Sequence, residues 1–471
     1  MSGLECSEYR FSNIDEQYRI DAEYYQKKYI DAYEKICQKK YLYMNELIDV
    51  LTDFHSNGSY KTIAANFKLL DKKDYAYMIR TIDLENDNYN NNVKYIDKKA
   101  YNFLAKSKLY GGEIVINKIG NPGKTYYVPK LNRKMSLGMN LFMIRAKKKF
   151  TTNEFLYCFL NTKIGKLIIE RKINGAVPLS IDKHSIKTLP VPIVSNDIKV
   201  NITKLIQESQ IIHDEFKKLY CQAEEFLLNV LGLKRFKPLT DNVSIKTFSE
   251  SFGVTGRLDS EYYQTKFDEL LSFVSKHSTK KMADIVSIKK SIEPGSDYYL
   301  EDGIPFIRVQ NLTKFGLTDT EIFLNKTMFK DAIRPKKDTI LLSKDGSVGI
   351  AYKIEKNTNI ITSGAILHLH VKDDEVLPEY LTLVLNSIVV KLQAERDAGG
   401  SIIQHWKQKE IEEIIIPIID KSKQIKISSL VKKSFELRKK SEQLRNLAIE
   451  VVDIAIKEHE DKALKYLKQN M

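Results

Sequence analysis

The chain has 471 residues, 43% of them hydrophobic and 29% charged, with 75 Lys and Arg against 61 Asp and Glu and a net charge of +14. This composition fits a globular protein of two or three domains and excludes collagen-like, low-complexity and disordered chains. The N-terminus is too polar for a signal peptide, and no apolar run reaches the roughly 18 residues of a membrane span. We therefore expect a cytoplasmic protein whose basic surface attracts polyanions such as nucleic acids.

The first feature in chain order is a motif that occurs twice. The stretch RIDAEYYQKKY begins at Arg19 and returns as RLDSEYYQTKF at Arg257. Further pairs follow in the same order, namely MIRTIDL (78–84) with FIRVQNL (306–312), IVINKIGNPGKTYYV (114–128) with ILLSKDGSVGIAYKI (340–354), and LPVPI (189–193) with IIIPI (414–418). Solenoid repeats have periods of about 20 to 50 residues, so these long-range pairs indicate instead one domain present in two copies.

Each copy is predicted to be mixed α/β. The segments around Ile79, Val115, Ile340 and Leu367 are short, rich in β-branched residues and bounded by Gly, Asn or Asp, which is typical of strands. The stretches after residues 153 and 378 carry apolar residues three and four positions apart, which predicts amphipathic helices.

A long helix is predicted after each copy. Apolar or small residues recur at alternating steps of four and three, at Ile198, Ile202, Leu205, Ser209, Ile212, Phe216, Leu219, Ala223, Phe226 and Val230, and again from Ile427 to Ala455. This is the seam of a coiled coil, and we expect the two helices to pair with each other rather than to pack on separate cores. Asp197 and Asp420 are the expected N-terminal caps.

The predicted order is therefore domain, helix, domain, helix. The segments are 1–193, 194–235, 236–418 and 419–471. The fold class is α/β (mixed α+β), with two duplicated domains separated by two long helices that form an antiparallel coiled coil with pseudo-two-fold symmetry.

On these residues, the chain resembles the specificity subunit of a Type I restriction-modification system. The resemblance covers essentially the whole chain and is carried by the doubled RIDAEYY/RLDSEYY, by SKDGSVGIAYKI, and by the turns NGAVPLS and GGSIIQH. It implies two target recognition domains that read a bipartite, asymmetric site in double-stranded DNA. It also implies partners, namely two modification methyltransferase subunits and an ATP-dependent restriction subunit. The first copy departs from the commoner pattern at NKIGNPGKTYY, so its loop is expected to meet DNA differently.

The candidate DNA-binding residues lie at matching places in the two copies. The glycine loops GNPG and GSVG are either plain turns or places where the backbone comes close to a DNA phosphate. A lysine precedes each loop and could neutralise the charge of that phosphate. Arginine on the strands suits guanine or phosphate, and neighbouring amides suit adenine. The candidates are Arg80, Lys118, Asn121, Lys124, Arg308, Gln310, Asn311, Lys344, Ser347, Ser401, Gln404 and His405. Trp406, the single tryptophan, is either a core residue or part of this surface. The RxDxEYY motif is too alike in both copies to read different half-sites, so we assign it to the fold or to subunit docking.

We expect neither catalysis nor a cofactor. The chain lacks an Asn-Pro-Pro-aromatic motif, a glycine-rich cofactor loop and a P-loop. No metal site is predicted, because His368 and His370 have no further ligand at suitable spacing, and the four scattered cysteines are expected to be reduced thiols. Two other functions stay open, namely the DNA-reading subunit of a Type II restriction enzyme and a coiled-coil interaction protein that does not bind DNA.

Overall fold

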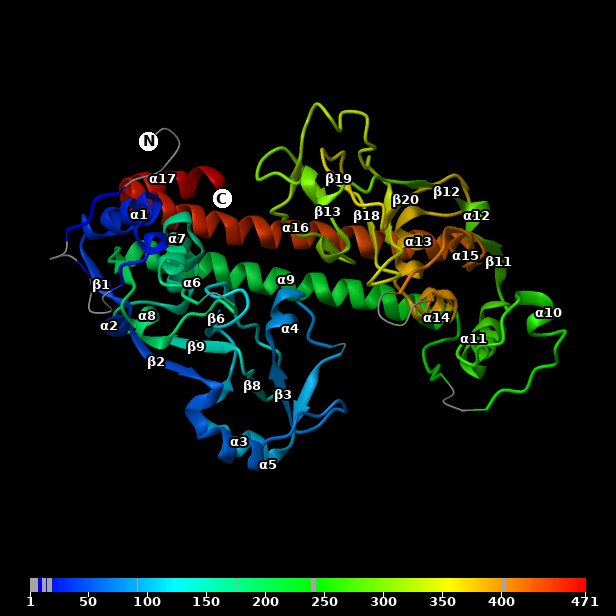
Figure 1. The fold of residues 1–471 in the computed structure, drawn as a ribbon, viewed down its shortest axis with the longest axis horizontal. Helices are drawn as coiled ribbons and strands as arrows, with labels where there is room; N and C mark the ends of the chain where they lie inside the picture. The colour runs from blue at the N-terminus through cyan, green and yellow to red at the C-terminus, as the bar shows by residue number, and fades with distance from the viewer. Residues whose placement is uncertain are drawn as a thin grey trace. The chain divides into compact units, whose positions relative to one another are not determined.

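The computed structural model describes residues 7–10, 14, 19–90, 92–175, 177–238, 243–399 and 404–471. The chain forms two compact units (Figure 1). Unit 1 comprises Met1–His213 and Lys439–Met471, and unit 2 comprises Asp214–Arg438. Each unit thus takes one half of each long helix, whereas the predicted domain boundaries fall at the helix ends and stay a prediction.

Unit 1 contains two four-stranded sheets. The first has the order β2 (Ile48–Asp53), β9 (Leu141–Ala146), β6 (Ile114–Asn117), β7 (Thr125–Tyr127) and is antiparallel throughout. The second has the order β4 (Lys94–Ile96), β3 (Ala76–Ile79), β8 (Met135–Leu137), β5 (Lys108–Leu109), with β3 and β8 parallel. Every residue of β3 and β6 is buried, which explains why these short strands read as continuous apolar runs.

Unit 2 has a similar topology, with three strands instead of four in its second sheet. Its first sheet has the order β12 (Val286–Lys290), β20 (Ile366–Val371), β17 (Ile340–Ser343), β18 (Ala351–Lys353). Its second has the order β16 (Phe323–Leu324), β13 (Ile304–Ile307), β19 (Ile361–Thr362), and β13 and β19 are again parallel. A further hairpin joins β14 (Leu312–Thr313) to β15 (Gly316–Leu317). The strands predicted around residues 79, 115, 340 and 367 are confirmed.

A pair of helices covers the first sheet of each unit. In unit 1 they are α6 (Asn153–Asn161) and α7 (Lys163–Arg171), and in unit 2 α13 (Pro378–Leu385) and α14 (Ile388–Asp397). The helices predicted after residues 153 and 378 are confirmed. The other helices of unit 1 are α1 (Lys27–Cys37), α2 (Met44–Leu47), α3 (Tyr60–Asn66), α4 (Thr81–Glu85), α5 (Lys98–Phe103), α8 (Lys183–Lys187) and α17 (Glu460–Asn470). Those of unit 2 are α10 (Phe252–Thr255), α11 (Thr265–Val274), α12 (Met282–Ile285) and α15 (Gln408–Glu412).

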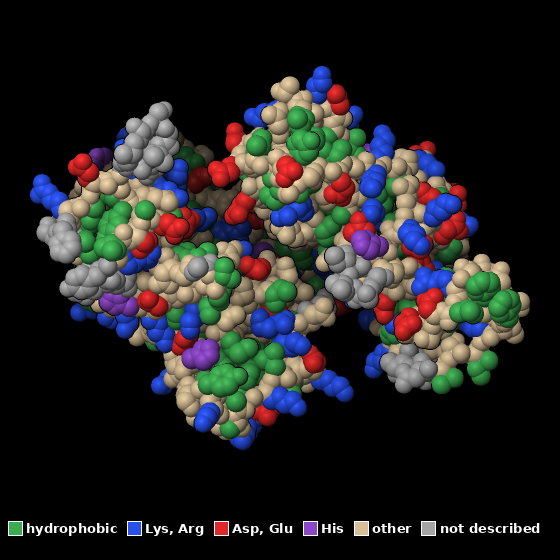
Figure 2. Space-filling view, in the orientation of Figure 1, with side chains coloured by type: hydrophobic (Ala, Val, Ile, Leu, Met, Phe, Trp, Pro, Cys, Tyr) green, Lys and Arg blue, Asp and Glu red, His purple; other side chains and the backbone are tan. Residues whose placement is uncertain are grey.

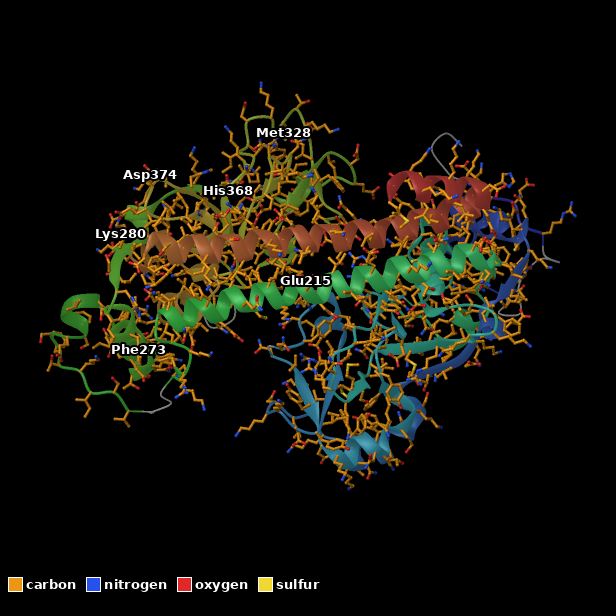
Figure 3. All side chains as sticks on the ribbon, turned by 180° about the vertical axis from the view of Figure 1, so that it is seen from behind. Glu215, Phe273, Lys280, Met328, His368 and Asp374 are labelled. Carbon is orange, nitrogen blue, oxygen red and sulfur yellow. The ribbon has the colours of Figure 1, made fainter. Side chains whose placement is uncertain are left out.

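One short antiparallel pair of strands joins the beginning and the end of each copy. In unit 1, β1 (Tyr41–Tyr43) pairs with β10 (Pro190–Pro192), and in unit 2, β11 (Ser278–Lys281) pairs with β21 (Ile415–Ile418). Each pair ties the beginning of a copy to the proline-containing strand that leads into its long helix. At this end of unit 2, the Lys280 Nζ lies 2.7 Å from Asp373 and 2.6 Å from Glu375, and Lys280 and Asp374 lie near each other in Figure 3.

The long helices are α9 (Asn196–Val230) and α16 (Lys421–Lys457), and they run antiparallel within each unit (Figure 1). In unit 1, the Ser209 hydroxyl donates to the Ser441 carbonyl at 2.8 Å, and the Ser441 hydroxyl donates to the Ser209 carbonyl at 2.9 Å. In unit 2, the Lys426 Nζ lies 4.3 Å from the centroid of the Phe226 ring. The predicted helix pair is confirmed, while α16 ends at Lys457 and a separate helix, α17, follows it.

The buried stripe of α9 departs from the predicted seam in its second half. It follows the predicted positions from Ile198 to Phe216 but then continues through Tyr220 and Leu227, while Leu219 is only partly buried. A straight α-helix drifts about 20° per heptad relative to a strict seven-residue repeat, so the face in contact moves by one residue. At the start of this helix, Ser195 rather than Asp197 accepts a backbone hydrogen bond, from Ile198 at 3.4 Å.

None of the helices in the described part of the chain combines the length and the hydropathy of a membrane span.

Candidate nucleic-acid interface

A glycine loop follows the central strand of the first sheet in each unit. In unit 1, the Gly123 amide donates to the Asn117 carbonyl at 2.9 Å, and in unit 2, Gly349 donates to Ser343, also at 2.9 Å. The φ angles of these glycines, 85° and 83°, lie in the left-handed region, which other residues adopt only with strain. The two loops therefore have the same backbone path, as their alignment predicted.

A second turn packs against each glycine loop. In unit 2, the Gly346 amide donates to the Gln404 carbonyl at 2.9 Å, and the Trp406 amide donates to the Lys344 carbonyl at 2.8 Å. In unit 1, Gly120 donates to Leu179 at 3.2 Å, and Ile181 donates to Lys118 at 3.1 Å. Segments about 60 residues apart thus form one surface in each unit.

Lys118 lies at an ion-pair cluster in unit 1. Its Nζ is 3.2 Å from Asp53, and the Nζ of Lys183, on α8, is 2.8 Å from the same carboxylate. Asp53 is only 4% exposed. Burial by itself would raise the pKa of Asp53, but hydrogen bonds from Lys183 and Ser56 and the nearby ammonium groups lower it to about 2. Asp53 therefore stays ionised and fixes two lysines beside the loop.

The equivalent lysine of unit 2 has a different partner. Lys344 pairs with the neighbouring Asp345, whose other oxygen lies 2.8 Å from the Nδ1 of His405. The side chain of His405 is 64% exposed, and Gln404 and Ser347 are exposed beside it. Four of the predicted residues, Lys344, Ser347, Gln404 and His405, are thus brought together, while Ser401 lies outside the described residues.

Arg80 and Arg308 follow the equivalent strands β3 and β13. The amide of Arg80 donates to Asp83 at 2.9 Å, and its guanidinium also donates to this carboxylate, at 2.7 and 3.2 Å. In unit 2, the amide of Arg308 donates to the side chain of Asn311 at 3.2 Å. The Asn311 amide nitrogen in turn donates to the Asp319 carbonyl at 2.9 Å, so this side chain is engaged in holding its loop. Gln310 beside it is exposed.

The two remaining candidates of unit 1 lie at the tip of its glycine loop. Lys124 is exposed, and its Nζ lies 3.3 Å from Glu85. The side chain of Asn121 is exposed as well, and the backbone carbonyl of Asn121 accepts a hydrogen bond from the Asn117 side chain at 2.8 Å. The assignment of all these side chains to DNA contacts stays a prediction.

The RxDxEYY motif forms the same internal contacts in both copies. The Arg19 guanidinium binds Asp21 at 2.8 Å through two nitrogens and lies 4.5 Å from the Tyr24 ring centroid. Arg257 binds Asp259 at 2.8 and 2.5 Å and lies 4.4 Å from Tyr262. A further arginine stacks on the same tyrosine in each copy, Arg171 from α7 at 4.2 Å and Arg396 from α14 at 5.2 Å. These contacts support the assignment of the motif to the fold.

Two residues that the sequence left open belong to the core of unit 2. Trp406 is fully buried in its main hydrophobic cluster. His368 on β20, labelled in Figure 3, is 1% exposed and lies 2.8 Å from the Thr362 hydroxyl. Burial lowers the pKa of His368 to about 4, so this side chain is neutral at pH 7. The described residues contain no cluster of three or more His, Cys, Asp or Glu side chains arranged to hold a metal ion.

Sequence reasoning missed Asp53, Lys183 and Asp345. Asp53 lies 65 positions before Lys118 and 130 before Lys183, so only the folded sheet reveals their contact. Asp345 stands directly after Lys344 in the sequence, and this adjacent pair of opposite charges was an available signal.

Residues 275–450 match the family model described as the Type I restriction modification DNA specificity domain. Among solved structures, the Type I restriction-modification system S subunit from M. genitalium is 15% identical with a TM-score of 0.38, covering 91% of this chain and 95% of that one. The HsdS subunit from Thermoanaerobacter tengcongensis is 11% identical with a TM-score of 0.29, covering 89% and 97%. A structure described as showing complex assembly and conformational transition of the type I R-M system has the same identity and TM-score, covering 89% and 98%.

The comparison with curated proteins gave no match.

Proposed function

We propose, from the match of residues 275–450 to the model of Type I restriction modification DNA specificity domains, that the whole chain reads a bipartite, asymmetric DNA site. Unit 1 and unit 2 each read one half of the site. The chain recruits two modification methyltransferase subunits and an ATP-dependent restriction subunit, and it is itself not an enzyme. The cytoplasm, where DNA and these partners meet in a bacterial cell, is its expected location.

The observation that carries this proposal is the pair of loop surfaces, one in each unit. The two loops have the same backbone hydrogen bonds but different side chains. The hydrogen bonds that hold the glycine loop against the second turn are the same in both units. The side chains on this frame differ, because Leu179 and Ser180 stand where unit 2 has Gln404 and His405. Since bases are read by side-chain donors and acceptors, equal frames with unequal side chains support two different half-sites.

The charge of the chain supports nucleic acid as the ligand. The net charge is +14, and lysines lie next to both loops, where they can approach phosphates. Lys118 and Lys344 are each paired with a carboxylate. Contact with a phosphate would therefore exchange one anionic partner for another.

A gel-shift titration of the full chain with genomic DNA at low and high salt tests the proposal. We expect binding that weakens steeply with salt, because each phosphate contact releases counterions. Absence of any shift at low salt would favour a coiled-coil interaction protein instead. In a second assay, the purified chain should neither methylate nor cut DNA with S-adenosylmethionine, ATP and magnesium, and turnover by the chain alone would overturn its assignment as a non-catalytic subunit.

A further inference from the structure

Unit 1 carries a cluster of lysines and tyrosines that is separate from its glycine loop. The Nζ of Lys134 donates to the Tyr75 hydroxyl and lies 4.0 Å from the centroid of that ring. The Nζ of Lys98 lies 6.0 Å from the Tyr75 ring, and the Nζ of Lys108 lies 4.7 Å from the ring of Tyr101. The two rings meet edge to face at 5.6 Å. We call these five residues the lysine–tyrosine cluster.

The positive charge of this cluster is not balanced by carboxylates. In the part of the chain that the structure describes, Lys98, Lys108 and Lys134 form no salt bridge. The nearest acidic residues in sequence bind backbone amides rather than these lysines: Asp74 accepts from the Tyr75 amide at 2.6 Å and Asp97 accepts from the Ala100 amide at 2.7 Å. Figure 2 shows further Lys and Arg side chains around the lobe of unit 1 that carries α3 and α5.

Three like charges around two rings repel one another, and a bound anion would remove this repulsion. The Tyr75 hydroxyl responds to the surrounding charge, since the hydrogen bond from Lys134, and to a lesser degree the ammonium groups of Lys98 and Lys108, lower its pKa. Lysine ammonium groups and a tyrosine hydroxyl are donors that bind phosphate oxygens in DNA complexes.

The cluster lies at the N-terminal ends of strands β3 and β8, whereas Arg80 lies at the C-terminal end of β3. Tyr75 and Lys134 directly precede the parallel strands β3 and β8, whereas Arg80 follows β3. The five residue steps from Tyr75 to Arg80 span roughly 16 Å along an extended strand. This length corresponds to about five base pairs at about 3.4 Å each, so one duplex can contact both places.

The cluster belongs to the first copy alone. The parallel strand pair β3–β8 of unit 1 corresponds to the pair β13–β19 of unit 2. Ile79 lies opposite Leu137 in the first pair, and Ile307 lies opposite Thr362 in the second. By this register, the positions of Tyr75 and Lys134 are occupied in unit 2 by Gly303 and Asn359. The duplicated fold therefore does not require these side chains.

We propose that the lysine–tyrosine cluster binds a backbone phosphate of the DNA that flanks the half-site of unit 1, on the side away from Arg80. This inference rests on the proposed function, because it takes the phosphate from a DNA duplex. It adds a contact that anchors unit 1 without reading bases, and it makes the two units unequal in their dependence on salt.

The test compares two triple variants of the full chain that lose the same charge. K98Q/K108Q/K134Q removes the cluster, and the control K35Q/K163Q/K166Q removes three exposed lysines on α1 and α7 of the same unit. Binding to a long mixed-sequence duplex is followed by fluorescence anisotropy over a range of salt concentrations. We expect the cluster variant to lower the slope of log affinity against log salt by about 0.9, the value for one phosphate contact, and the control to leave the slope unchanged. K98R/K108R/K134R keeps the charges and should keep the slope.

The outcomes separate the inference from the proposed function. Equal slopes for the cluster variant and the control, with normal binding by the unaltered chain, would overturn the inference and leave the proposed function intact. Failure of the unaltered chain to bind any duplex would overturn both. Inorganic phosphate is the second probe: if it raises the melting temperature of the unaltered chain but not of the cluster variant, while the duplex slopes are equal, the cluster is a site for free phosphate and the inference is wrong.

Discussion

Replacing Asp53 by Asn should destabilise unit 1 by an amount that depends on pH. The folded state lowers the pKa of Asp53 from 3.8 to about 2, which corresponds to about 2.4 kcal/mol, because a tenfold change in an equilibrium is worth about 1.36 kcal/mol. A depressed pKa stabilises the folded state above the unfolded value of 3.8, and this contribution is lost as the pH falls toward 2. At pH 3 about half of it should remain.

Amide hydrogen exchange in β2 and β9 measures this effect in unit 1. Relative to the unaltered chain at the same pH, exchange through unfolding of the unit should be about sixty-fold faster in D53N at pH 7 and about tenfold faster at pH 3. Fluorescence of Trp406, the single tryptophan and buried in unit 2, should be unaffected and serves as an internal control.

Asp49 on the same strand is exposed, so D49N is the matched control. The reasoning is refuted if D53N exchanges like D49N at pH 7, or if the ratio of rates does not fall between pH 7 and pH 3. Since D53N also releases Lys118 and Lys183 from their shared carboxylate, its affinity for mixed-sequence DNA should rise rather than fall, which distinguishes this variant from one that merely damages the fold.

Four further predictions concern the loop surfaces, the long helices and the first domain. Lys344→Ala should weaken binding to all DNA sequences about equally and lower the salt slope by about one, whereas a change in the preferred sequence would make Lys344 a base reader. In a double-mutant cycle on Ser209 and Ser441, either single Ala variant should lower the free energy of unfolding by about 1 to 2 kcal/mol, and the double variant should lower it by less than the sum. The reason is that the two hydroxyls bond each other and the opposite carbonyls. Strict additivity of the two free-energy changes would contradict this. Deleting four residues from each long helix removes about 6 Å, so methylation-site mapping should show a spacer shorter by one or two base pairs with both half-sites unchanged, and a fixed spacer would exclude the helices as the ruler. Exchange of residues 1–193 for those of another family member should change one half-site only.

The elements that the sequence predicted are those whose signal is local. Ile79, Val115, Ile340 and Leu367 lie in short apolar runs, and all four are buried on strands. The long helices were predictable because their period persists over many turns, but the exact buried face was not. The drift from Leu219 to Tyr220 depends on the difference between 3.6 and 3.5 residues per turn, which accumulates too slowly to appear in a short window.

The candidate site was predictable only in part, because side-chain partners are set by tertiary contacts. The alignment of the two copies located both glycine loops and the turns that pack on them. It did not indicate that the Asn311 amide is already engaged by Arg308 and Asp319, since asparagine in a loop is equally consistent with a free side chain. Asp53 was not predicted as part of the site for a related reason. It stands at the end of strand β2, and nothing in the neighbouring sequence indicates the two lysines that its carboxylate binds.

Duplication explains why the two loops can diverge without loss of the fold. The frame of each loop is made by backbone hydrogen bonds, by glycines at positive φ, and by one short polar side chain, Asn117 or Ser343, that donates to the carbonyl four residues later. None of these contacts depends on the identity of the exposed side chains at Leu179 and Gln404, or on those at Asn121 and Ser347. Substitutions at such positions change the hydrogen-bonding groups offered to DNA at little cost in folding free energy, since surface changes away from caps and buried networks usually alter it by less than about 0.5 kcal/mol. Under the proposed function, the side chains that read DNA and the contacts that hold the loop are therefore different atoms. Each copy can then change the sequence it reads while the RxDxEYY contacts and the helix pair remain the same.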